Sequence, residues 1–131
     1  MIVRTAAMAI GLVAMAGAAS AQGIQQQAEA RAKAITAELQ THTALAKAES
    51  GKAAAALRSG DKASACTSFK VSRAEAQKVV DLFPQQREQV MIATSDAALA
   101  VARVQKIDEN HGVWVTLASQ LDERIKLACG S

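Results

Sequence analysis

Apolar residues recur at intervals of three and four along most of the chain, which is the spacing of one face of an α-helix. No segment shows the alternation of apolar and polar residues that is typical of a half-buried strand. We therefore predict an all-α fold, a small helical bundle of three to four antiparallel helices. These helices are expected at residues 24–58, 62–82, 84–109 and 113–129.

The turn between the first two predicted helices carries the strongest local signal. Ser59-Gly60-Asp61 offers a glycine for a left-handed C-terminal cap and then an aspartate as N-cap of the next helix. The predicted buried stripe of the first helix comprises Ala28, Ala32, Ile35, Leu39, Ala46, Ala53 and Leu57. That of the second comprises Cys66, Phe69, Arg73, Ala76, Val80 and Phe83, where Arg73 interrupts the apolar pattern.

Two further boundaries divide the rest of the chain. Phe83-Pro84 is expected to end the second helix, because the residue before a proline is displaced from the helical region, and Pro84 can begin the third. Asn110-His111-Gly112 is expected to end the third, and Val113-Trp114-Val115 can be extended before a shorter last helix. The predicted buried faces are Val90, Thr94, Ala97, Val101 and Val104, and then Trp114, Leu117, Leu121, Ile125 and Ala128.

The first residues have the pattern of a cleavable signal peptide. Arg4 precedes the small-apolar run of residues 6–16, and Ala19-Ser20-Ala21 provides small residues at the expected cleavage site. We predict removal of residues 1–21, a periplasmic or secreted protein, and one helical domain over 22–131. An uncleaved anchor is the alternative, although the run is shorter than the roughly 20 residues that span a bilayer. No later stretch is free of charges, so no integral membrane segment is expected after cleavage.

The two cysteines, Cys66 and Cys129, are expected to form a disulfide, since exported chains fold in oxidising compartments. A redox pair, metal ligands and a bond between two chains are the alternatives. In an up-down-up-down bundle of four helices the two positions lie at opposite poles. We therefore predict that the C-terminal helix crosses the others obliquely, which would bring the cysteines together.

Composition and charge indicate which classes of binding partner to expect. Removing Arg4 with the signal lowers the net charge from +3 to +2, and the large side chains are few because alanine fills many apolar positions. Residues 31–78 hold nine Lys/Arg against four Asp/Glu, whereas residues 79–131 hold five against seven. Such halves can complement each other within one fold or in a dimer. Basic residues are not interleaved with stacking aromatics, so no nucleic-acid partner is expected.

Candidate catalytic or cofactor chemistry is sparse. His42, His111 and Met91 are the only candidate haem ligands in the mature chain, and Cys-x-x-Cys-His is absent. The carboxylate pairs Asp108-Glu109 and Asp122-Glu123 are sequence neighbours, which point to different sides of a helix. We predict no catalytic residues, no metal and no cofactor. A small-ligand or haem-binding bundle and a hydrolase of unrecognised type are the alternatives.

One segment resembles a known repeat. Residues 59–69 are similar to the turn and second helix of a tetratricopeptide repeat, with Ala65 and Phe69 at its packing positions and Ser72 where a small alanine is expected. This resemblance covers one repeat at most, and a plain helical hairpin accounts for the same residues. It would imply a peptide or protein partner. The function expected from the whole sequence is non-enzymatic, through a protein partner or a homo-oligomer in the cell envelope.

Overall fold

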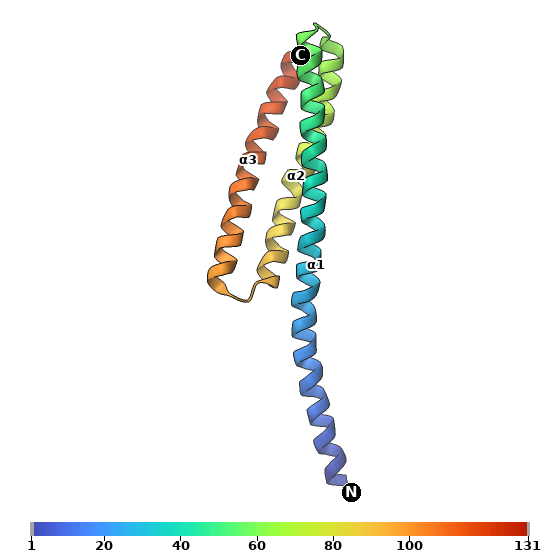
Figure 1. Ribbon diagram of the computed structural model, residues 1–131, viewed down its shortest axis with the longest axis vertical. Helices are drawn as coiled ribbons and strands as arrows, with labels where there is room; N and C mark the ends of the chain where they lie inside the picture. The colour runs from blue at the N-terminus through green and yellow to red at the C-terminus, as the bar shows by residue number, and fades with distance from the viewer. Residues whose placement is uncertain (1, 131) are drawn as a thin grey trace.

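The computed structural model describes residues 2–130, with side chains described at position 20 and from 22 to 130. These residues form three helices, α1 (Ile2–Arg58), α2 (Lys62–Ala93) and α3 (Ala97–Cys129). Figure 1 shows α2 and α3 as an antiparallel hairpin beside α1, whose N-terminal part projects beyond them. The predicted all-α antiparallel bundle is confirmed. Most side chains of the predicted signal peptide lie outside the described residues, and its cleavage stays a prediction.

Helix α2 is central because two adjacent rows of its side chains are each covered by a different helix. Ser72 bonds to α1, where its hydroxyl donates to the Ala46 carbonyl at 2.7 Å. The next residue, Arg73, bonds instead to Asp122 of α3 at 2.8 Å. Both rows repeat every seven residues, the period at which helices keep one side against a neighbour. The α1 row comprises Ala65, Ser72, Val79 and Gln86, and the α3 row comprises Cys66, Arg73, Val80 and Arg87.

Small side chains line the contact between α1 and α2. Ala53 and Ala65 have no exposed surface, Ala46 is 3% exposed, and Ser72 is 1% exposed. Side chains of this size let two helix backbones approach closely, so dispersion contacts between the backbones replace those of large side chains. The Ser72 hydroxyl is satisfied by Ala46 and so adds no unpaired polar group to the seam. The small size of these side chains thus allows α1 to pack closely against α2.

Helix α3 runs without interruption through Asn110-His111-Gly112, so the predicted boundary there and the extended segment after it are wrong. The reason is an unbroken row of inward positions at spacings of four and three. His111 belongs to this row, and its ring stacks on Phe83 at a centroid distance of 5.5 Å. Packing along the whole row outweighs the low helix propensity of one glycine. The row comprises Ile107, His111, Trp114, Ala118, Leu121, Ile125 and Ala128.

Pro84 lies inside α2 rather than at its end, which corrects the second predicted boundary. A proline in a helix interior costs about 3 kcal/mol, because it lacks an N–H and its ring crowds the preceding turn. Its side chain is exposed, whereas Phe83 just before it and Val90 beyond it are both buried. Burial of these two side chains holds the chain helical on either side of the proline.

The chain reverses between α2 and α3 at Thr94-Ser95-Asp96, where no turn was predicted. Asp96 is the N-cap of α3 and accepts a hydrogen bond from the Leu99 amide at 2.8 Å. Arg103 donates to the Thr94 hydroxyl at 2.7 Å and lies 3.7 Å from the Glu29 carboxylate of α1. The predicted turn at residues 59–61 is confirmed, with Gly60 at φ 80° and Asp61 accepting from the Ser64 amide at 3.0 Å.

The buried side chains form two clusters along the bundle. The one nearer the α2–α3 loop centres on Val79, Phe83 and Ile107, and the one nearer the cysteines centres on Phe69, Ala76 and Leu121. Trp114 packs against both clusters and so joins them. Four residues predicted to be buried are exposed, namely Leu57, Ala97, Val101 and Leu117.

Substitutions at two glycines, Gly112 and Gly60, test the continuity of α3 and the conformation of the first turn. Gly112 is helical, and a Cβ built there meets no atom within 4 Å, so Gly112→Ala should raise the free energy of unfolding by about 0.5–1 kcal/mol. Gly60 has a positive φ, so Gly60→Ala should lower the free energy of unfolding by about 1 kcal/mol. Urea unfolding of both variants measures the difference. A loss of stability in Gly112→Ala would contradict a continuous α3.

Candidate functional site

Cys66 and Cys129 lie at disulfide-bonding distance, with their Cα atoms 5.0 Å apart. Cys66 is in the first turns of α2 and Cys129 is the last residue of α3. The 32 residues of α2 and the 33 residues of α3 have nearly equal lengths, about 48 and 50 Å, so α3 returns to the level at which α2 began. The predicted proximity of the two cysteines is present, and it follows from the length of α3. Figure 1 also shows α3 inclined away from α1 toward the α2–α3 loop.

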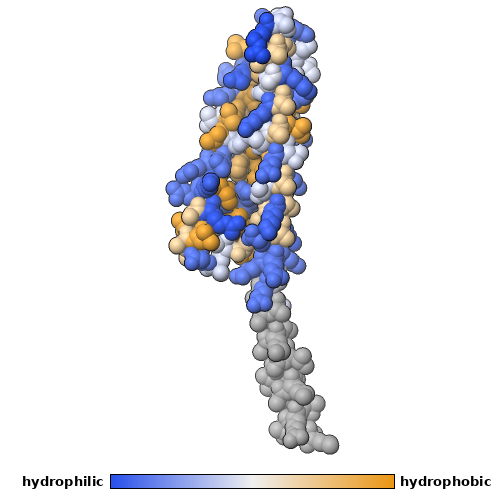
Figure 2. Space-filling view, viewed as in Figure 1, coloured by the Kyte–Doolittle hydropathy of each residue, from blue (hydrophilic) through white to orange (hydrophobic). Residues whose placement is uncertain are grey.

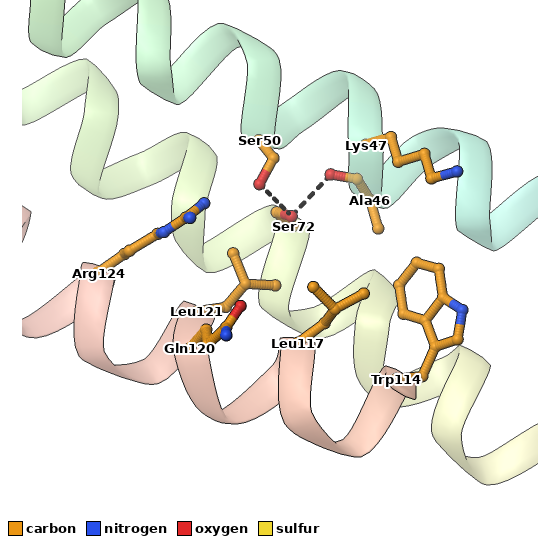
Figure 3. A pocket seen from close by; sticks show the side chains of 9 residues that line it. All are labelled: Ala46, Lys47, Ser50, Ser72, Trp114, Leu117, Gln120, Leu121 and Arg124. Carbon is orange, nitrogen blue, oxygen red and sulfur yellow. Dashed lines mark hydrogen bonds between the residues drawn. The ribbon is translucent and has the colours of Figure 1, made fainter. Parts of the chain in front are cut away.

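A cavity of about 170 Å³ lies between α1 and α3, with α2 as its floor. Figure 3 shows Trp114, Leu117 and Leu121 of α3 on one side of it and Ala46 of α1 on the other. Ser72 reaches it from α2, but its hydroxyl is already bonded to Ala46 and lies 3.4 Å from the Ser50 hydroxyl. The walls are therefore mainly apolar, with the polar atoms of the floor satisfied.

Two cations border this cavity. Lys47 belongs to α1 and Arg124 to α3, and Figure 3 shows them at opposite ends of it. Both side chains are exposed. Among the side chains that the structure describes, neither forms an ion pair, in contrast to Arg73, Arg87 and Lys126. The cavity thus combines an apolar interior with uncompensated positive charge at its margin.

The outer face of the α2–α3 hairpin is apolar near the loop. We call it the loop-end patch, consisting of Met91, Ala100, Val101 and Val104, which line a hollow of about 720 Å³. Met91 is 52% and Val101 67% exposed. Figure 2 shows apolar side chains gathered at the loop end of the hairpin, at the lower left of the molecule. Arg87, Asp108 and Glu109 border the hollow, and Arg87 lies 3.1 Å from Asp108.

The two histidines lie apart and contact different groups. His42 of α1 forms a hydrogen bond with the Glu75 carboxylate of α2, and Lys78 lies 3.0 Å from the same carboxylate. The bond with His42, followed by that from Lys78, lowers the pKa of Glu75 below its ordinary value. His111 stacks on Phe83. Met91, the third candidate haem ligand, lies at the loop-end patch.

The carboxylate pairs contact basic or amide side chains. Asp108 pairs with Arg87, and Asp122 with Arg73. Glu109 accepts from the Gln105 amide at 3.3 Å, and Glu123 lies 3.3 Å from Lys126. Among the described side chains, no three or more His, Cys, Asp or Glu residues gather into a group that could hold a metal ion. In the described part of the chain, no helix has the length and apolar character needed to cross a membrane.

Comparison with known proteins gives no match. No family model matches the chain, and no curated protein and no solved structure matches it at a significant level. The likeness of residues 59–69 to a tetratricopeptide repeat is therefore carried by those residues alone. The helical hairpin they were expected to form is present, and Ala65, Phe69 and Ser72 are buried in it.

Sequence reasoning identified the cysteine pair but missed the cavity and the loop-end patch. Lys47 and Arg124 belong to different helices, and no local motif connects them. The available signal was the inward row of α3, which continues through Gly112 and aligns Trp114 with Leu121 on one helix. Reading that row as continuous would have predicted one long C-terminal helix beside α2.

Removing the cross-link should destabilise the fold strongly. The cysteines are separated by 63 residues, and loop-closure entropy predicts a loss of about 4 kcal/mol in the free energy of unfolding for the Cys66→Ala/Cys129→Ala variant. Urea unfolding with and without reductant measures this loss. Reductant should destabilise the wild type by a similar amount and leave the double variant unchanged. A wild type insensitive to reductant would contradict the cross-link.

Proposed function

We propose that this protein is exported and acts without catalysis, by self-association in the cell envelope through the loop-end patch. The observation that carries this proposal is the hollow beside Met91 and Val101, where large apolar side chains remain exposed. Contiguous exposed apolar surface bordered by polar residues is typical of protein interaction sites.

A second copy of the chain suits this patch because both signs of charge border it. Arg87, Asp108 and Glu109 border the hollow, and Arg87 is paired with Asp108, whereas Glu109 has no ion pair among the described side chains. A twofold axis brings the same patch of both copies together, so each Arg87 can approach an acidic side chain of its partner. Val101, which projects into solvent, can enter the hollow of the other copy. Patches with only one sign of charge would repel each other in this arrangement.

Export is supported by two separate features. The N-terminal pattern of Arg4, an apolar run and Ala19-Ser20-Ala21 is typical of a cleaved signal. Cys66 and Cys129 lie at bonding distance, and structural disulfides persist mainly in oxidising compartments. The absence of catalysis is supported by the carboxylate contacts, since Asp108 and Asp122 are each paired with an arginine.

Intact mass of the protein expressed with its native N-terminus tests export. We expect the mass of residues 22–131, and an increase by two hydrogen atoms after reduction, because cleavage and cross-linking both follow export. Mutation of Ala19 and Ala21 to bulky residues should leave the N-terminal segment attached. A full-length, reduced protein confined to the cytoplasm would contradict the proposal.

Sedimentation velocity tests self-association. The wild type should shift from monomer to dimer as its concentration rises, whereas Val101→Asp should remain monomeric because a charge cannot enter the apolar hollow without cost. Leu127→Asp is the matched control, since Leu127 is 80% exposed and does not line the patch. It should dimerise like the wild type. A wild type that stays monomeric throughout, or equal effects of both variants, would overturn the proposal.

A further inference from the structure

We propose that the cavity between α1 and α3 is a binding site for a small aromatic carboxylate, whose ring enters beside Trp114 and whose anion is held by Arg124, with Lys47 adding positive charge at the other end. This site is separate from the loop-end patch, which lies on the outer side of α2 and α3. The inference does not depend on self-association, because none of the residues lining the cavity lines the patch.

The size of the cavity limits the apolar part of the ligand to about one ring. Its volume is about 170 Å³. An engineered apolar cavity of about 150 Å³ in another protein binds benzene, whereas drug-sized ligands occupy pockets of roughly 300–1,000 Å³. Trp114 and Leu121 supply flat and branched apolar walls, and the floor offers no unsatisfied hydroxyl for a polar group. A single aromatic ring is therefore the apolar group that fits this cavity best.

The charge of the ligand follows from the margin of the cavity. Lys47 and Arg124 carry positive charge, and no described carboxylate pairs with either. Arg73 and Arg87 are paired with Asp122 and Asp108, whereas Lys47 and Arg124 border the apolar cavity without a described partner. An anion bound here gains attraction from both cations without breaking an existing ion pair. Arginine in particular matches a planar carboxylate with two parallel donors.

The position of Trp114 makes the site directly observable. It is the only tryptophan of the chain, which has no tyrosine, so the emission reports on the surroundings of this one side chain, which include the cavity. Titration with benzoate should give a saturable change in Trp114 emission. Benzyl alcohol keeps the ring without the charge, and acetate keeps the charge without the ring. Both should bind several-fold more weakly than benzoate.

Two variants separate the contributions of charge and space. Lys47→Gln/Arg124→Gln should weaken benzoate binding several-fold while leaving benzyl alcohol unaffected, since one exposed ion pair to Arg124 and the longer-range attraction of Lys47 are lost. The matched control, Arg58→Gln/Lys70→Gln, removes one arginine and one lysine that do not line the cavity, and should bind benzoate like the wild type. Ser50→Leu fills the cavity at unchanged charge and should abolish binding of both ligands.

Circular dichroism verifies that each variant keeps its helices, so that loss of binding is not loss of fold. The charge variant alters only exposed side chains and tests the proposal even if Ser50→Leu unfolds. No saturable emission change with benzoate up to about 10 mM would overturn the proposal. So would equal affinity of the two double-glutamine variants, or binding of acetate as tight as that of benzoate.

Discussion

Helix α2 is packed between α1 and α3 by two neighbouring rows of its side chains. Each row repeats every seven residues, and together they determine the rest of the architecture. The row that includes Ser72 contacts α1, and the row that includes Arg73 contacts α3. Because adjacent positions on one helix point in directions about 100° apart, the two partners lie on different sides of α2. Side chains bridge α1 and α3 on one side, where the small cavity remains, and the outer side of the hairpin stays open. Both candidate binding surfaces are thus consequences of the position of α2.

Local sequence signals predicted this fold only where local chemistry determines the structure. The turn at Gly60 and Asp61 was predicted because a left-handed glycine followed by an N-cap forms a turn whatever surrounds it. Pro84 and Gly112 misled the prediction, because each disfavours a helix by a few kcal/mol or less, while inward rows continue on both sides of it. Tertiary packing outweighs a single unfavourable residue when the buried pattern is unbroken. The turn at Asp96 was missed because Thr94 and Ala97 fitted an apparent helical face.

The candidate sites were less predictable than the fold. The cysteine pair followed from composition and from the expected compartment. The cavity requires knowing that Lys47 and Arg124 lie beside the same opening, which depends on the relative register of α1 and α3. Charge counts along the chain indicated a basic N-terminal half, but they could not show which cations have partners. That distinction arises from cross-helix contacts such as Arg73 with Asp122 and Arg87 with Asp108.

The cross-link has a consequence for how the molecule can open. With Cys66 bonded to Cys129, α2 and α3 form a covalent ring, in which the turn at residues 94–96 joins one end and the sulfur atoms join the other. Helix α1 lies outside this ring, attached by residues 59–61 and by non-covalent packing. In the oxidised protein, α1 is therefore the segment that can separate as a cooperative unit without breaking a bond. An exchange of helices between two copies would likewise trade α1 and keep each ring intact.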